Sequence, residues 1–154
     1  MTPMTHALDP AAPLKQRLTE GAVALVDDDE HIARALELWL QVSALSPSLH
    51  LSAESLLDSL QMHEGQVWVP VTSLDESPTR WAPLVAAVMD LNLTGINGFE
   101  LARRLRELAP QVPLVVITAA TDEDLFRYGA VPESVVCLRK PFRLDELERV
   151  LNAD

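Results

Sequence analysis

Val85-Ala86-Ala87-Val88-Met89-Asp90, running directly into Leu91-Asn92-Leu93-Thr94-Gly95-Ile96-Asn97-Gly98, is the stretch that decides the fold. A short apolar run with two valines stops at a carboxylate and is followed by Thr, Asn and Gly, a pattern typical of a buried strand rather than a helix. Asp90 then lies at the carboxyl end of that strand. In parallel α/β sheets this edge opens the crevice in which ligands bind, so we expect Asp90 in a functional site.

Similar apolar runs recur on both sides of this stretch. Residues 22–26 lead into three aspartates, residues 114–118 end on a threonine, and residues 134–138 precede Arg139 and Lys140. A shorter strand is expected at 49–51. Helices are expected to begin near Asp29, Ser52, Asn97 and Thr121, with a terminal helix through Leu144 and Leu151. The alternation predicts an α/β fold with a five-stranded, doubly wound parallel sheet and helices on both faces.

The length of 154 residues fits one compact domain. We interpret residues 1–20, which begin rich in Pro and Ala, as a flexible N-terminal leader and residues 21–154 as the domain. Residues 62–83 interrupt the pattern and are read as an insertion. Within it, three structures remain open for residues 66–71, which alternate weakly and end at prolines: an extra extended segment, an extension of the preceding helix, or a long loop.

The composition excludes several partners. With 23 acidic and 12 basic residues the formal net charge is −11, which repels nucleic acid phosphates and anionic lipids, so no direct nucleic acid binding is expected. No apolar run approaches the ~20 residues of a membrane span. Cys137 is the single cysteine and excludes an internal disulfide, which agrees with a cytoplasmic location.

The polar groups that follow the predicted strands are Asp27, Asp28, Asp90, Thr118 and Lys140, and they gather at one edge if those strands are neighbours. Three adjacent carboxylates repel each other unless they share a cation. Mg²⁺ prefers oxygen ligands, and we assign it the carboxylates of Asp28 and Asp90 and the backbone carbonyl of Asn92. Asp27 contacts the ion through water.

This arrangement leaves an oxygen of Asp90 available as a nucleophile toward phosphorus, with an acyl phosphate as the product. The transferred phosphoryl group spreads negative charge over its oxygens. The ammonium of Lys140 and the hydroxyl of Thr118 can pair with that charge. The sequence therefore predicts phosphoryl-transfer chemistry at the sheet edge.

Four motifs in this order resemble the receiver domain of two-component response regulators: Val26-Asp27-Asp28-Asp29, the stretch from Asp90 to Leu101, Ile117-Thr118-Ala119 and Lys140-Pro141-Phe142. The resemblance covers about residues 21–151 and implies a flavodoxin-like fold. It further implies an acidic pair at Asp27 and Asp28, the phosphoacceptor at Asp90, the switch hydroxyl at Thr118 and the family lysine at Lys140. The donor would be a phosphohistidine on a sensor histidine kinase or a histidine phosphotransfer protein. Such a domain catalyses only its own phosphorylation and dephosphorylation, with Mg²⁺ as cofactor.

The sequence also departs from the family pattern. Thr94 stands where the family usually has proline, and Asn97 where aspartate is common. Cys137 occupies the place of an aromatic residue that commonly moves with the switch hydroxyl, and Pro132 shortens the preceding helix. We therefore expect phosphorylation to be retained and signalling to depart from the usual route. Output through a protein target or a separate output domain, and a homodimer, remain open.

Two other functions compete with this interpretation. Residues 88–94 also resemble the Asp-x-Asp-x-Thr signature of haloacid-dehalogenase-type phosphatases, although Asn92 replaces the second aspartate. A receiver-shaped binding module without a phosphorylation switch is the other alternative. Because only three residues follow Leu151, the chain is read either as a single-domain regulator or relay intermediate, or as a fragment of a longer regulator.

Overall fold

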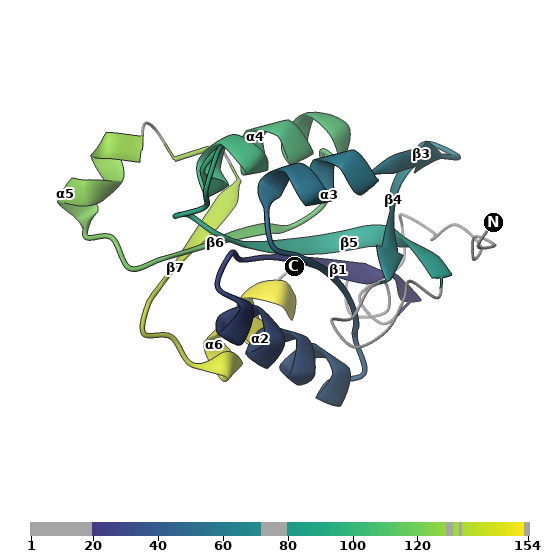
Figure 1. The fold of residues 1–154 in the computed structure, drawn as a ribbon, viewed down its shortest axis with the longest axis horizontal. Coiled ribbons are helices and arrows are strands. Elements are labelled where there is room, and N and C mark those ends of the chain that lie inside the picture. Colours follow the sequence, from purple (N-terminus) through teal and green to yellow (C-terminus); the bar gives the residue numbers. More distant parts are fainter. Residues whose placement is uncertain (1–19, 72–79, 129–130, 133, 153–154) are drawn as a thin grey trace.

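The computed structural model describes residues 20–71, 80–128, 131–132 and 134–152. Five strands run parallel in the order β2-β1-β5-β6-β7 (Figure 1). They are β1 (Ala22–Val26), β2 (Ser46–His50), β5 (Arg80–Asp90), β6 (Leu114–Thr118) and β7 (Val135–Arg139). The helices are α2 (Glu30–Val42), α3 (Ala53–Ser59), α4 (Gly98–Leu108), α5 (Asp122–Leu125) and α6 (Leu144–Asn152), and a 3₁₀ turn, η1 (Phe126–Tyr128), continues α5. The predicted doubly wound parallel sheet is confirmed.

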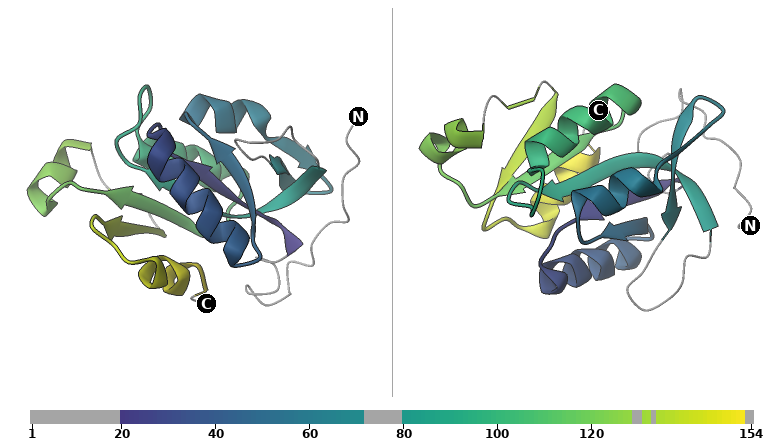
Figure 2. Two further views of the ribbon diagram at one scale, coloured as in Figure 1. Left: turned by 60° about the horizontal axis from the view of Figure 1, so that its bottom comes forward. Right: turned by 45° about the horizontal axis from the view of Figure 1, so that its top comes forward.

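Helices cover both faces of the sheet. Figures 1 and 2 show α3 and α4 on one face and α2 and α6 on the other. The alternation of β1 explains this arrangement, because Ala22, Ala24 and Val26 face the core under α3 and α4 while Val23 and Leu25 face the core against α2 and α6. A strand that is buried on both faces has no polar position, which is why β1 is an uninterrupted apolar run.

Two further strands extend the sheet. β3 (Gln61–His63) and β4 (Gln66–Val71) form an antiparallel hairpin, and β4 pairs antiparallel with residues 80–83 of β5. The hairpin turns at Glu64 and Gly65, both with positive φ, as a two-residue turn of this kind requires. Of the three alternatives for residues 66–71 of the predicted insertion, the extra extended segment is confirmed, because these residues form β4. Residues 72–79 of that insertion and residues 1–19 of the predicted leader lie outside the described residues.

Several element boundaries differ from the prediction, three of them by three residues or more. β5 begins at Arg80 rather than Val85, because its first residues pair with β4. β2 begins at Ser46 rather than Leu49, because Ser46 and the proline after it already pair with β1. The helix expected near Thr121, read from the sequence as running to Tyr128, is α-helical only to Leu125 and ends as the 3₁₀ turn.

The predicted helix caps are confirmed and fix where the loops of the sheet edge end. The Asp29 carboxylate accepts the N–H groups of His31 and Ile32 at the start of α2. The Asn97 side chain accepts the N–H of Glu100 at 3.0 Å at the start of α4. The loops after β1 and β5 are therefore short and end on capped helices.

Acid sensitivity is expected at His50, the last residue of β2. The imidazole is buried and hydrogen-bonds the hydroxyls of Ser48 and Ser55, each at 2.9 Å. Burial lowers its pKa from 6.5 to about 4. Because unfolding then takes up a proton, the contribution of His50 to stability is full above about pH 6.5 and is lost as the pH falls toward 4, by about 2 kcal/mol at pH 5. The raised pKa of Asp27 changes stability in the opposite direction over the same range, so urea unfolding at pH 7.5 and pH 5 isolates the His50 contribution only as the difference between the wild type and His50→Gln.

Between pH 7.5 and pH 5, His50→Gln should lose about 2 kcal/mol less stability than the wild type, and the same change at the exposed His31 serves as the control. Equal loss of stability in the wild type and His50→Gln would contradict the assignment.

Candidate functional site

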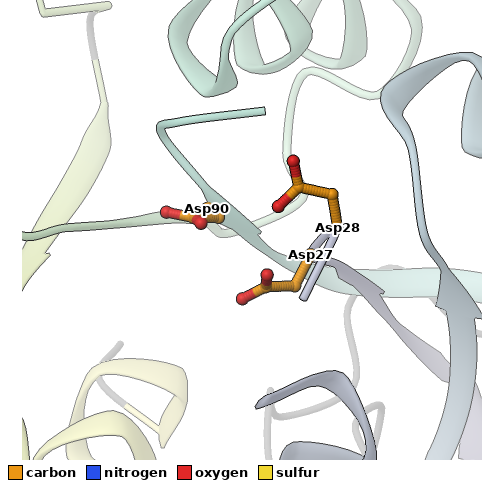
Figure 3. Close-up of side chains that lie close together, drawn as sticks. All are labelled: Asp27, Asp28 and Asp90. Atoms are coloured by element: carbon orange, nitrogen blue, oxygen red, sulfur yellow. The ribbon is translucent and has the colours of Figure 1, made fainter. Parts of the chain in front are cut away.

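Three carboxylates meet at the carboxyl edge of the parallel sheet (Figure 3). Asp27 and Asp28 follow β1, and Asp90 ends the adjacent strand β5. Val26 is paired with Met89, so the next residue of each strand is an aspartate at the same level of the sheet. One carboxylate oxygen from each of the three residues lies within 4.8 Å of the others. The cluster expected from the sequence is present.

The three carboxylates differ in environment. Asp27 and Asp90 are buried, at 4% and 9% exposure, whereas Asp28 is exposed. Asp27 Oδ1 accepts the N–H of Asp29 at 2.9 Å, and Asp90 Oδ1 accepts the N–H of Asn92 at 3.4 Å. Each is thus fixed by a backbone donor two positions further along its own loop. Their remaining lone pairs are available for other ligands.

The carboxyl group of Asp27 has a raised pKa, mainly because it is buried. Burial, with smaller contributions from the charges of Asp90 and Asp28, raises the pKa of this carboxyl from 3.8 to about 6. The N–H of Asp29 and the charge of Lys140 act in the opposite direction. A divalent cation shared by the cluster would relieve this repulsion.

Lys140 brings a positive charge to the same place. Its Nζ lies 3.7 Å from Asp90 Oδ1, and its side chain is 27% exposed. The backbone N–H of Lys140 donates to the carbonyl of Thr118 at 2.8 Å, which ties the end of β7 to the end of β6. Lys140 therefore approaches the carboxylate cluster from the end of β7, which lies on the side of β6 away from β5.

Thr118 ends β6 one position after Ile117, which is paired with Asp90. It is buried, at 3% exposure, and its Oγ1 accepts the N–H of Ala120 at 2.9 Å. A hydroxyl that accepts one hydrogen bond still has a proton to donate. Thr118 is therefore placed on the strand next to Asp90 with its hydroxyl held by its own loop.

Two features of the loop after β5 were not predicted. The Thr94 hydroxyl donates to Asp28 Oδ2 at 3.1 Å, whereas the sequence marks Thr94 only as standing where the family usually has proline. Gly98 packs so closely on the end of β5 that an added Cβ would lie 2.5 Å from the carbonyl oxygen of Asp90. The signals in the sequence are a hydroxyl four residues after Asp90 and a glycine at the start of a helix.

Residues 79–152 match the family model of the response regulator receiver domain. This chain carries a receiver domain of that family. The receiver domain is 28% identical to the uncharacterized transcriptional regulatory protein YkoG of Bacillus subtilis over 138 residues, which cover 84% of this chain and 49% of YkoG. It is 27% identical to the transcriptional regulatory protein FixJ of Rhizobium meliloti, over 81% of this chain and 52% of FixJ. The chain thus spans about half the length of these two relatives.

Solved structures agree on the fold. The non-phosphorylated HemR receiver domain from Leptospira biflexa aligns with a TM-score of 0.58 and 24% identity, covering 87% of this chain and 96% of that domain. A flavodoxin-like receiver fold is therefore established. Among the described residues, no helix has the length and apolar character that crossing a bilayer requires.

Cys137, which stands where the resemblance leads one to expect an aromatic residue, lies in β7 and packs against the core under α4. Burial raises the pKa of its thiol. Both observations fit the interpretation of Cys137 as a small packing residue rather than a reactive thiol.

Proposed function

We propose that this receiver domain accepts a phosphoryl group on Asp90 and so acts as the phosphoacceptor of a two-component or phosphorelay system. The observation that carries the proposal is the meeting of Asp27, Asp28 and Asp90 within 4.8 Å, with Lys140 at 3.7 Å from Asp90. The match to the receiver family and the two regulators at 28% and 27% identity support it.

In the proposed step, a carboxylate oxygen of Asp90 attacks the phosphorus of a phosphohistidine. A P–O bond to Asp90 forms, the P–N bond breaks, and its electron pair leaves with the imidazole, which takes up a proton. Lys140 pairs with the negative charge of the transferred group, and the Thr118 hydroxyl donates to one of its oxygens after turning from its own loop. The product is an aspartyl phosphate.

The residues present fit a Mg²⁺ ion, because the cluster offers only hard oxygen donors and is crowded with negative charge. We assign its binding to the carboxylates of Asp28 and Asp90 and the carbonyl of Asn92, with Asp27 acting through water. When bound, the ion neutralises charge on the phosphoryl oxygens. Asp27 adds negative charge beside the ion. The N–H of Asn92 donates to Asp90 and holds its carboxylate in place.

The donor is a sensor histidine kinase or a histidine phosphotransfer protein, and the site is cytoplasmic. The output is a change in contacts with a protein target or an output domain, with a homodimer as one form of such a contact. The net charge of −11 argues against direct contact with nucleic acid or anionic membranes. Phosphorylation shifts the population between two arrangements of the elements around Thr118 and Lys140.

Incubation of the full chain with Mg²⁺ and acetyl phosphate, followed by intact-mass measurement, tests the proposal. We expect a single phosphoryl adduct that depends on Mg²⁺ and is absent when EDTA is added. No adduct with any small phosphodonor supports the receiver-shaped binding module instead. Steady turnover of p-nitrophenyl phosphate supports the aspartate-dependent phosphatase.

Lys140→Ala should separate phosphorylation from the conformational response. Without the ammonium, the adduct forms roughly tenfold more slowly, and it no longer draws the end of β7 toward Asp90. NMR spectra recorded before and after phosphorylation should show shifted amide signals around Thr118 in the wild type and small shifts in the variant. Arg143→Ala is the control, because it removes an exposed cation that lies just before the first residue of α6. Wild-type shifts in Lys140→Ala would exclude this role for the lysine.

A further inference from the structure

We propose that Thr94 is a positioning residue that holds the Asp28 carboxylate ready for the divalent cation. The inference rests on the proposed Mg²⁺ site and adds a residue to its support. The Thr94 hydroxyl donates to Asp28 Oδ2 at 3.1 Å across 66 positions of the sequence. This bond joins the loop between β5 and α4 to the loop between β1 and α2.

Asp28 needs such a partner more than the other two aspartates do. Asp27 and Asp90 are buried and are each held by a backbone N–H of their own loop. Asp28 is exposed, so water and free rotation compete with any fixed orientation of its carboxylate. The hydroxyl of Thr94 restricts this rotation from the neighbouring loop.

The loop presents Thr94 rigidly. Leu93, the residue before it, is buried at 8% exposure, and its N–H donates to the carbonyl of Leu91 at 3.1 Å. Gly95, the residue after it, has a φ of +88°, and a Cβ there would lie 2.7 Å from Glu54 Oε1 on α3. Thr94 is itself exposed, but it stands between a buried side chain and a glycine in the left-handed region that packs against the Glu54 side chain, so the loop backbone that carries its hydroxyl is held on both sides.

The hydrogen bond orients Asp28 without using up its capacity as a ligand. An ionised carboxylate has about four lone-pair sites on its two oxygens, and Thr94 occupies one of them. An oriented ligand loses less rotational freedom on binding a cation, so affinity rises. Proline, the residue usual at this position in the family that the sequence resembles, has no side-chain donor. A receiver domain with proline at this position could not form the hydrogen bond that Thr94 makes to Asp28.

The test is the affinity of the full chain for Mn²⁺, measured from the EPR signal of the free ion, with Mg²⁺ as competitor. Thr94→Val removes the hydroxyl and keeps the shape, and we expect the affinity for both ions to fall roughly three- to tenfold. Thr94→Ser keeps the hydroxyl and should bind like the wild type. Thr121→Val is the matched control, because Thr121 makes the same kind of bond to Asp124 outside the carboxylate cluster, at 3.0 Å.

Thermal unfolding without metal separates positioning from folding. The Thr94→Val protein should unfold within a few degrees of the wild type when no metal is added, and should gain less stability when Mg²⁺ is added. Unchanged affinity in Thr94→Val, or a loss that Thr94→Ser shares, overturns the inference while the Mg²⁺ site stands. Absence of Mn²⁺ and Mg²⁺ binding in the wild type overturns the proposed site itself.

Discussion

Asp90→Asn is expected to abolish the phosphoryl adduct while leaving the protein folded. An amide has nearly the same shape as the carboxylate but is a far weaker nucleophile, so no acyl phosphate forms. The change also removes one negative charge from the cluster in which Asp90 helps to raise the pKa of Asp27. The free energy of unfolding should therefore stay the same or increase. Intact mass after exposure to acetyl phosphate and Mg²⁺ measures the adduct, and urea unfolding measures the stability.

Asp145→Asn is the matched control for this experiment, since Asp145 is a carboxylate of α6 that is half exposed and paired with Arg143 and Arg149. It should be phosphorylated like the wild type. A full adduct in Asp90→Asn would mean that another residue accepts the phosphoryl group, and the role assigned to Asp90 would be wrong.

Gly98→Ala is expected to displace the backbone that positions Asp90. The added Cβ would lie 2.5 Å from the carbonyl oxygen of Asp90 and 2.8 Å from the Cα of Leu91, and both contacts are with backbone, which cannot swing aside. The end of β5 or the start of α4 must move. We expect a loss of about 1–3 kcal/mol in the free energy of unfolding. Because Asp90 is displaced from its partners, phosphorylation should slow roughly a hundredfold.

Gly65→Ala provides the comparison for Gly98→Ala. Gly65 lies at the tip of the β3–β4 hairpin with a φ of +75°, and nothing lies within 4 Å of an added Cβ. An alanine there is strained by about 1–2 kcal/mol but is remote from the carboxylates. Stability should fall in both variants, and the phosphorylation rate only in Gly98→Ala. Equal phosphorylation rates in the two variants would refute the claim that Gly98 positions Asp90.

The strand ends were predictable because burial on both faces leaves a simple signal. In β1 and β6 every position is buried, so the apolar run stops where the chain leaves the sheet, at Asp27 and at Thr118. The carboxyl ends of parallel strands share one edge, and that rule was enough to gather the polar groups. The caps at Asp29 and Asn97 were predictable for a similar reason, since each is a local hydrogen bond between residues near in sequence.

The hairpin and the early start of β5 were not predictable in the same way. Pro70 and Pro83 obscure these strands in the sequence, because proline lacks the N–H that a ladder requires. In the structure Pro70 lies beyond the part of β4 that pairs with β3, and Pro83 precedes the part of β5 that pairs with β1. Prolines are tolerated there because those positions have a partner on one side only.

The support of the site also depends on contacts that no local pattern reveals. The bond from Thr94 to Asp28 joins residues that are far apart in sequence, and the packing of Gly98 on Asp90 depends on how α4 leaves the loop. The residues proposed to carry the chemistry could be read from strand ends. The residues proposed to position them required the tertiary structure.

Chemical mapping of the phosphorylated residue tests the central claim most directly. Borohydride reduces an aspartyl phosphate to homoserine, so the wild type phosphorylated with acetyl phosphate and Mg²⁺ is reduced, digested and sequenced by mass spectrometry. The account predicts homoserine at position 90, with Asp27 and Asp28 unchanged. Homoserine at position 27 or 28, or a stable phosphate on a serine, threonine or histidine with Asp90 intact, would contradict it.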